Sequence, residues 1–262
     1  MGKRPRRQIV LFLVEGDSER FALQNRMAAL FDEIDESIEV FFPAIFQQDS
    51  EDPAAKIETG GDITQMYTVY PGNYDSKVYE YFLRDFFDIE KILPKDVKQI
   101  YQLVDMDGAY IPEALVTQYE SPDTAGKPHY GENGILCKHP ATINSRHKRK
   151  RCNLDYLATK NTIKVGTKTI PFEAYFFSSN LDHFLHNDAN LPDTQKTFVA
   201  GCFSDGFIGD SAGFANFFLT DPDSMTDCTL EESWARATEQ NTLFTLQRHT
   251  NFNLLIEKLM KK

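Results

Sequence analysis

Residues 8–19 read QIVLFLVEGDSE, and this stretch is the most informative in the sequence. Residues 9–14 of this stretch are an unbroken apolar run, which is typical of a strand buried on both faces of a sheet. Glu15-Gly16-Asp17 is the expected turn after that strand. Ser18 is the expected N-cap of a helix, because apolar residues recur at helical spacing from Phe21 to Phe31. The stretch therefore predicts a strand, a turn and a helix in succession.

Two more apolar runs extend this pattern. Residues 38–42 (IEVFF) and 99–104 (QIYQLV) are expected to be strands, and residues 78–93 between them have helical periodicity that ends before Pro94. The alternating order implies parallel strands joined by right-handed crossovers. Functional sites of such sheets lie just past the carboxyl ends of the strands. We therefore expect strands 8–14 and 99–104 to be neighbours.

The remaining sequence completes an α/β domain in which a parallel sheet is flanked by helices. We expect one domain, with a core of about 8–110 and 169–190 and a helical C-terminal region of about 200–262. Residues 169–177 (TIPFEAYFF) are the expected fourth strand, and residues 229–232 (TLEE) form a capping box that opens a C-terminal helix. Polar residues 47–77 are interpreted as an insertion or long loop, and 112–168 as a second insertion of loops and short helices.

Bulk composition excludes several classes of protein. The 262 residues carry 28 basic and 39 acidic side chains, a net charge of -11, which a uniformly basic nucleic-acid-binding protein would not have. Four cysteines do not make a disulfide scaffold at this length. No apolar run reaches the roughly 20 residues of a membrane span, so the expected location is the cytoplasm, without membrane contact.

Carboxylates follow two of the expected strands. Glu15 follows strand 8–14, and Asp105 and Asp107 follow strand 99–104. Alternate residues of an extended segment point the same way, so Asp105 and Asp107 are expected to face one ion. Hard oxygen ligands of this kind suit Mg²⁺ or Mn²⁺. The alternative is a plain turn and a solvated strand end.

LFLVEGDSERFAL (residues 11–23) followed by QLVDMDG (residues 102–108) resembles the Toprim domain of topoisomerases, primases and nucleases. The similarity is greatest to the nucleases of the overcoming-lysogenization-defect group and of small anti-phage abortive-infection proteins, and it covers residues 8–31 and 97–109. It implies that Glu15, Asp105 and Asp107 bind divalent metal and catalyse phosphoryl transfer. Glu19 matches a second acidic position of the nuclease branch. Asp182 lies where related nucleases place a further acid, or it only complements a helix dipole.

Two other clusters have competing interpretations. Cys137, His139, His147 and Cys152 lie within sixteen positions and bind zinc or are ordinary thiols and imidazoles. A basic run is interpreted as a nucleic-acid contact or as a solvated loop. Its candidate phosphate-binding residues are Arg146, Lys148, Arg149, Lys150 and Arg151.

The leading expectation is a Mg²⁺- or Mn²⁺-dependent nuclease that cleaves DNA or RNA, including tRNA, as an effector of bacterial anti-phage defence. The resemblance also implies a regulatory ATPase partner, and a homo-oligomer is a further expectation. One alternative is a catalytically silent Toprim-derived binding subunit of a defence complex. The other is a metal-dependent nucleotide phosphohydrolase.

Overall fold

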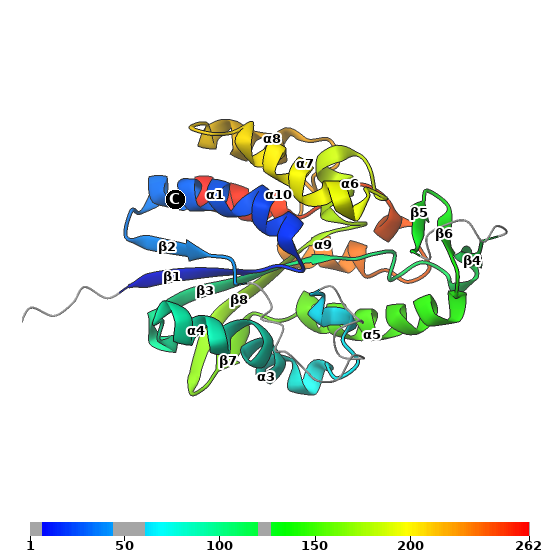
Figure 1. Ribbon diagram of the computed structural model, residues 1–262, viewed down its shortest axis with the longest axis horizontal. Helices are drawn as coiled ribbons and strands as arrows, with labels where there is room; N and C mark the ends of the chain where they lie inside the picture. Colours follow the sequence, from blue (N-terminus) through cyan, green and yellow to red (C-terminus); the bar gives the residue numbers. More distant parts are fainter. Residues whose placement is uncertain (1–6, 44–60, 120–126, 262) are drawn as a thin grey trace, which may run out of the picture.

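The computed structural model describes residues 7–43, 61–119 and 127–261. It is a mixed α/β structure in which helices cover both faces of a five-stranded sheet (Figure 1). The strand order is β2-β1-β3-β8-β7. The bounds of these strands are β1 Gln8–Leu13, β2 Ile38–Phe41, β3 Val97–Asp105, β7 Thr162–Val165 and β8 Lys168–Phe177.

Strand pairing places the carboxyl ends of β1 and β3 side by side. The two strands are parallel, with Leu11 opposite Ile100 and Leu13 opposite Gln102. β1 also pairs in parallel with β2, and β3 with β8, while β7 runs antiparallel to β8. The predicted adjacency of the first and third strands is confirmed, and so is the α/β class.

Alternation along the strands creates two cores. Ile9, Leu11 and Leu13 of β1 pack into one core, whereas Val10 and Phe12 pack into the other. Both faces of β1 are therefore buried, which explains its unbroken apolar sequence. The helices of one face are α1 Asp17–Ile34, α6 Leu181–His186, α7 Asp193–Asp205, α8 Ser211–Thr220 and α10 Phe252–Met260. Those of the other are α3 Tyr74–Val78, α4 Arg84–Glu90, α5 Pro140–Ala158 and α9 Leu230–Ala237.

Helix starts agree only partly with the sequence signals. Thr229 and Glu232 form the predicted capping box of α9. The cap predicted for Ser18 is wrong: α1 begins at Asp17, after Gly16 in extended backbone, and has no side-chain cap. This lets the chain enter α1 directly from the end of β1.

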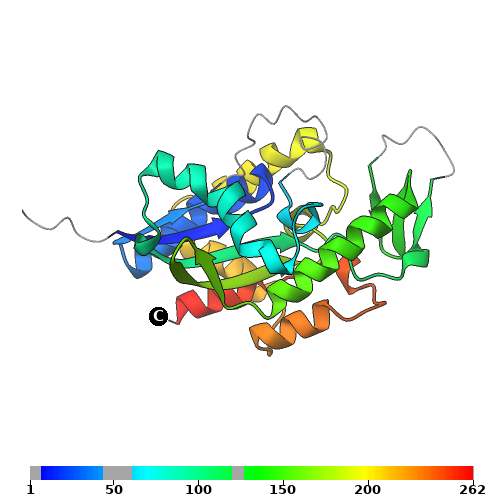
Figure 2. The same ribbon diagram turned by 90° about the horizontal axis from the view of Figure 1, so that it is seen from below.

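The interpretation of residues 112–168 as loops and short helices is wrong. The segment contains a second sheet and α5, a helix of 19 residues, and its last strand, β7, joins the large sheet. The small sheet has the order β4-β6-β5, with bounds β4 Val116–Gln118, β5 His129–Gly131 and β6 Gly134–Cys137. Figure 2 shows it at the far end of α5 from the large sheet. Its short strands carry too few residues for a clear alternating pattern.

The predicted loop at 47–77 lies partly outside the described residues. From residue 61 onward it contains 3-10 turns at Ile63–Gln65 and Pro71–Asn73 and then α3. A π-helical turn at Tyr79–Leu83 links α3 to α4, so the predicted helix over 78–93 begins earlier than expected. In the described parts of the chain, no helix is long and apolar enough to cross a membrane.

Candidate metal centre

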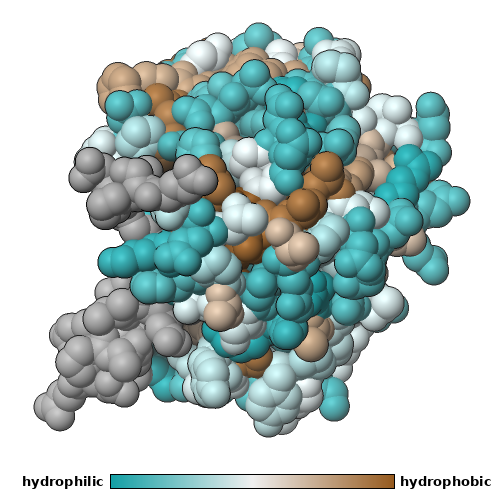
Figure 3. Space-filling model, turned by 90° about the vertical axis from the view of Figure 1, so that its right-hand side faces the viewer, coloured by the Kyte–Doolittle hydropathy of each residue, from teal (hydrophilic) through white to brown (hydrophobic). Residues whose placement is uncertain are grey.

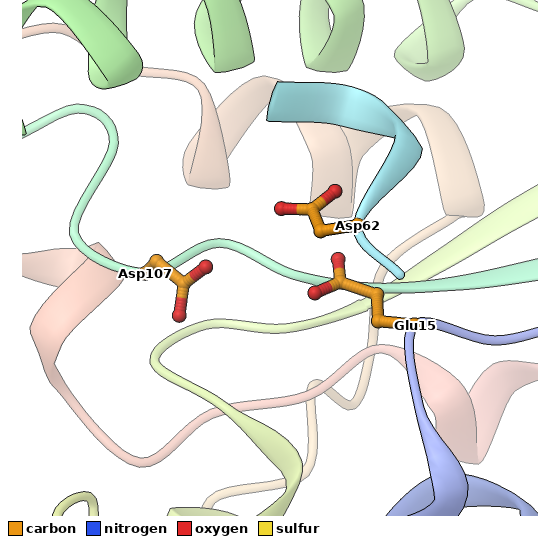
Figure 4. Close-up of side chains that lie close together, drawn as sticks. All are labelled: Glu15, Asp62 and Asp107. Carbon is orange, nitrogen blue, oxygen red and sulfur yellow. The ribbon is translucent and has the colours of Figure 1, made fainter. Parts of the chain in front are cut away.

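Three carboxylates converge beyond the carboxyl ends of β1 and β3. Glu15 follows β1, Asp107 follows β3, and Asp62 comes from the segment before the first 3-10 turn. Each offers an oxygen, and these oxygens all lie within 4.8 Å of one another. Figure 4 shows the three side chains pointing toward a common space. We call Glu15, Asp62 and Asp107 the acidic triad.

A glycine allows Asp62 to reach this position. Gly61 has a φ of 109°, and a Cβ there would lie 1.8 Å from the carbonyl oxygen of Glu15. Only glycine tolerates both that backbone angle and that approach. The Asp62 carboxylate then accepts hydrogen bonds from the Thr64 backbone N–H at 2.8 Å and from Gln65 Nε2 at 2.5 Å. Asp62 is therefore held beside Glu15 although 47 positions separate them in sequence.

Asp105 and Asp107 do not face one ion through strand alternation, and that expectation is wrong. β3 ends at Asp105, and Asp107 has a φ of 50°, so the extended geometry does not continue. Asp107 joins the acidic triad. Asp105 instead donates its backbone N–H to Glu15 Oε1 at 3.0 Å, and its Oδ1 accepts the Leu181 N–H at 3.0 Å. Asp105 is thus directed toward the start of α6.

Lys150 of α5 supplies a positive charge to the acidic triad. Its side chain is completely buried, and its ammonium donates to Asp107 Oδ2 at 2.6 Å and to Asp62 Oδ2 at 2.8 Å. Glu15 Oε1 lies 3.7 Å away. Burial lowers the pKa of Lys150, but the three carboxylates outweigh that effect and raise it well above its ordinary value. Lys150 is therefore a permanent cation beneath the triad.

A second acidic group lies beside the first. Glu19 and Asp182 are buried, and each raises the pKa of Asp105 by electrostatic repulsion, after the larger effect of burial. Asp182 Oδ2 pairs with Lys196 at 3.0 Å. Asp182 Oδ1 is buried and has no hydrogen-bond partner among the described residues, an arrangement that costs free energy unless something binds it. We call Glu19, Asp105 and Asp182 the second acidic group.

The charges of the two groups do not balance within the protein. Burial, then the charge of Asp62, raises the pKa of Glu15 well above its ordinary value, and burial likewise raises the pKa of Glu19. Among the described residues, these six carboxylates pair with the ammoniums of Lys150 and Lys196, which leaves four formal negative charges. Two divalent cations would neutralise them. The folded protein otherwise has to retain protons on some of these acids.

These shifts predict how stability depends on pH without metal. The pKa of Glu15 and of Asp105 is raised from 4.5 and 3.8, so their contribution is fully present below those values and is lost as pH rises through the higher folded values. Burial lowers the pKa of His147 to about 4, and its contribution is lost only as pH falls below its ordinary 6.5. Above pH 6.5, His147 is neutral in both the folded and the unfolded protein. The pH dependence that this site gives to the free energy of unfolding then comes from the acids. In EDTA, the free energy of unfolding should therefore fall as pH rises from 6.5, by on the order of 1.4 kcal/mol per pH unit for each acid still protonated.

Urea titrations at a series of pH values measure this slope. Magnesium should flatten it, because a bound cation stabilises the ionised carboxylates. A profile in EDTA that is flat above pH 6.5 would show that the folded pKa values of these acids do not reach that range.

Both acidic groups border a cavity of about 650 Å³. Its opposite wall is formed by Tyr130 of β5 and by the loop at 189–193. The hydroxyl of Tyr130 lies 3.4 Å from Asp107 Oδ1. Figure 3 looks onto this end of the molecule, where mostly hydrophilic residues surround a narrower hydrophobic band. The acids therefore line part of a cavity that is open on one side.

The basic run does not form one cationic surface, because it lies within α5 and its residues face different directions. Lys150 is buried against the acidic triad, so its interpretation as a nucleic-acid contact is wrong. Arg151 donates to the Ala109 carbonyl, and Arg149 to the Gln65 carbonyl. Lys148 is exposed and pairs with Glu113 at 3.2 Å, and Arg146 is half-buried. Only part of the run faces solvent.

The zinc candidates are not brought together. Cys137 is buried in β6, where its thiol donates to the Thr117 carbonyl, and Cys152 is exposed on α5. His139 precedes α5, and His147 is buried within it. In the described part of the chain, the acidic triad is the group of possible ligands that meets the spacing of a metal site.

Asp62 and Lys150 are the two residues of the centre that sequence reasoning misses. Asp62 lies in a polar segment without periodicity, and its only signal is the preceding Gly60-Gly61 pair. Lys150 carries a clearer signal. The buried face of α5 contains Ile143, His147, Lys150, Leu154 and Leu157, alternating in spacing between four and three. A lysine in that apolar pattern is expected to point inward.

Comparison of the chain with family models, curated proteins and solved structures finds no match.

Proposed function

We propose that this protein is a divalent-metal-dependent nuclease that hydrolyses phosphodiester bonds. The observation that supports the proposal is the acidic triad, whose oxygens converge at the ends of two adjacent parallel strands and face a cavity. Ligand sites of open α/β sheets lie at this edge. Phosphodiester hydrolysis is a common use of carboxylate-held metal ions.

The donor set fits Mg²⁺ or Mn²⁺. All donors of both acidic groups are carboxylate oxygens, which suit these hard cations rather than zinc or copper. Glu15, Asp62 and Asp107 would hold one ion. Glu19, Asp105 and Asp182 are not gathered at the spacing of a metal site, so we assign them to the surroundings of that ion rather than to a second one.

Each residue has a separate task in this chemistry. When bound, the metal lowers the pKa of a water nucleophile and neutralises charge on the phosphate. Lys150 donates hydrogen bonds to Asp62 and Asp107 and fixes their orientation. Glu15 is the triad carboxylate farthest from that ammonium, and burial raises its pKa, so it is suited to bind metal or to exchange a proton as general acid or base.

The resemblance of residues 8–31 and 97–109 to Toprim nucleases supports the same proposal and extends it. The role that it implies is an effector of bacterial anti-phage defence, controlled by an ATPase partner. The alternatives are a catalytically silent binding subunit and a nucleotide phosphohydrolase.

A small diester separates these functions without knowledge of the natural substrate. We expect hydrolysis of bis(p-nitrophenyl) phosphate in Mn²⁺ or Mg²⁺ and none in EDTA, measured by release of p-nitrophenolate. A matched assay with p-nitrophenyl phosphate reports monoester hydrolysis. Activity on the monoester alone would favour the phosphohydrolase, and activity on neither would favour the binding subunit.

A further inference from the structure

Hydrogen bonds and an ion pair hold together the wall of the cavity that faces the acidic groups. The backbone N–H of Tyr130 donates to Asn190 Oδ1 at 2.7 Å, and Asn190 Nδ2 donates to the Tyr130 carbonyl at 2.8 Å. An ion pair between Lys127 and Asp193 ties the same two segments together. A third hydrogen bond, from Asn180 Nδ2 to the Ala189 carbonyl at 3.0 Å, joins the loop to the start of α6. The small sheet and the loop therefore form one continuous wall.

The acids are recessed behind this wall. The side chains of Glu15, Asp62 and Asp107 are 17%, 5% and 18% exposed. A cavity of about 650 Å³ is in the range of about 300–1,000 Å³ that encloses small ligands. One nucleotide of a strand fits such a space. A base-paired nucleotide does not fit. Its phosphate lies on the outside of a broad duplex, and the second strand of that duplex would meet the wall when the phosphate approaches the acids.

We propose that the substrate is a single strand of nucleic acid, one nucleotide of which enters this cavity while duplex is excluded. The inference rests on the proposed nuclease function and specifies its substrate class. Tyr130 is the wall residue nearest the reacting phosphate, because a phosphate oxygen that approaches Asp107 comes within reach of the Tyr130 hydroxyl. A phenol hydroxyl carries a proton that it can donate. It is therefore a hydrogen-bond donor to the phosphate.

Binding measurements test the inference independently of catalysis. The probes are fluorescein-labelled oligothymidylate, oligouridylate and the duplex of oligothymidylate with oligoadenylate. Binding is followed by fluorescence anisotropy. Ca²⁺ replaces Mg²⁺ and Mn²⁺ so that binding is measured without cleavage. We expect both single strands to bind at least about tenfold more tightly than the duplex, which is the effect of about one base–protein contact. Equal affinity for duplex would overturn the inference. Displacement of the oligonucleotide by an equal concentration of thymidine monophosphate would also overturn it, because the site would then recognise a nucleotide rather than a strand.

The wall itself is tested with Asn190→Ala. The substitution removes both hydrogen bonds between the loop and β5, so duplex should gain access and the preference for single strands should fall several-fold. Asn133→Ala is the matched control, because Asn133 lies exposed in the turn between β5 and β6. A preference unchanged by Asn190→Ala would mean that the wall does not exclude duplex.

Tyr130→Phe tests the phosphate contact. It should lower kcat on oligothymidylate by about 100–1,000-fold, the range for loss of one preorganised donor, while the metal-induced rise in Tm stays as in the unsubstituted protein. An unchanged kcat would remove Tyr130 from the site. Hydrolysis of bis(p-nitrophenyl) phosphate distinguishes a wrong substrate class from a wrong nuclease function. Diester activity with equal duplex binding refutes only the substrate class, whereas no diester activity in any metal refutes the nuclease.

Discussion

Asp107→Asn should abolish both metal-dependent hydrolysis and most of the metal-dependent rise in melting temperature. The substitution removes one carboxylate oxygen from the acidic triad while almost preserving its shape. Asparagine also tolerates the left-handed backbone at this position, where φ is 50°, so the fold should remain intact. Loss of a direct ligand should reduce kcat by more than the roughly 10–100-fold that loss of an outer partner costs.

Differential scanning fluorimetry in EDTA, Mg²⁺ and Mn²⁺ measures the first effect, and cleavage of oligothymidylate measures the second. Unsubstituted protein should melt at a higher temperature with either metal, because a ligand that binds only the folded state stabilises it. Asp88→Asn is the control, since Asp88 is exposed on α4. A metal response in Asp107→Asn equal to that of the control would show that Asp107 is not a ligand.

Lys150→Met should destabilise the metal-free protein by about 3–5 kcal/mol, the cost of leaving buried charges without their partner. Asp62 and Asp107 lose a direct ion pair, and Glu15 loses the nearest positive charge. Methionine fills much of the same volume, so the loss measures charge rather than packing. Saturating Mg²⁺ should restore most of the stability, because the ion supplies the missing positive charge. The predicted quantity is therefore how much more free energy of unfolding Lys150→Met loses in EDTA than in Mg²⁺.

Urea unfolding in EDTA and in Mg²⁺ gives both values. Lys148→Met is the matched control, because Lys148 lies on the same helix with 63% of its side chain exposed. Its effect should be within about 0.5 kcal/mol in either condition. If Lys150→Met loses the same stability with and without Mg²⁺, then the triad does not bind the ion.

The fold was largely predictable from short stretches. Residues 8–14 and 99–104 are buried on both faces, so their apolar runs identify them as central strands, and the alternating element order gives their parallel adjacency. Residues 112–168 were not predictable in this way. The short strands of the small sheet have no clear period, and α5 is so polar that its buried stripe is inconspicuous.

The site was predictable only where a residue directly follows a strand. Glu15 and Asp107 fulfil that condition, and both are in the acidic triad. Asp62 does not, because its position depends on the close approach of Gly61 to Glu15, a tertiary contact that no local pattern encodes. Asp105 has the right position but a different direction, since the strand alternation used to orient it ends where the backbone turns at Asp107.

The wide separation of the site residues along the chain affects when the site can form during synthesis. Glu15, Asp62, Asp107, Lys150 and Asp182 lie on five segments, and the last of them enters α6. Proteins are made from the N-terminus, so a nascent chain carries the first carboxylates long before Lys150 and Asp182 exist. No fragment ending before α6 contains the complete centre. The complete site, and any activity that depends on it, therefore forms only after α6 has been synthesised.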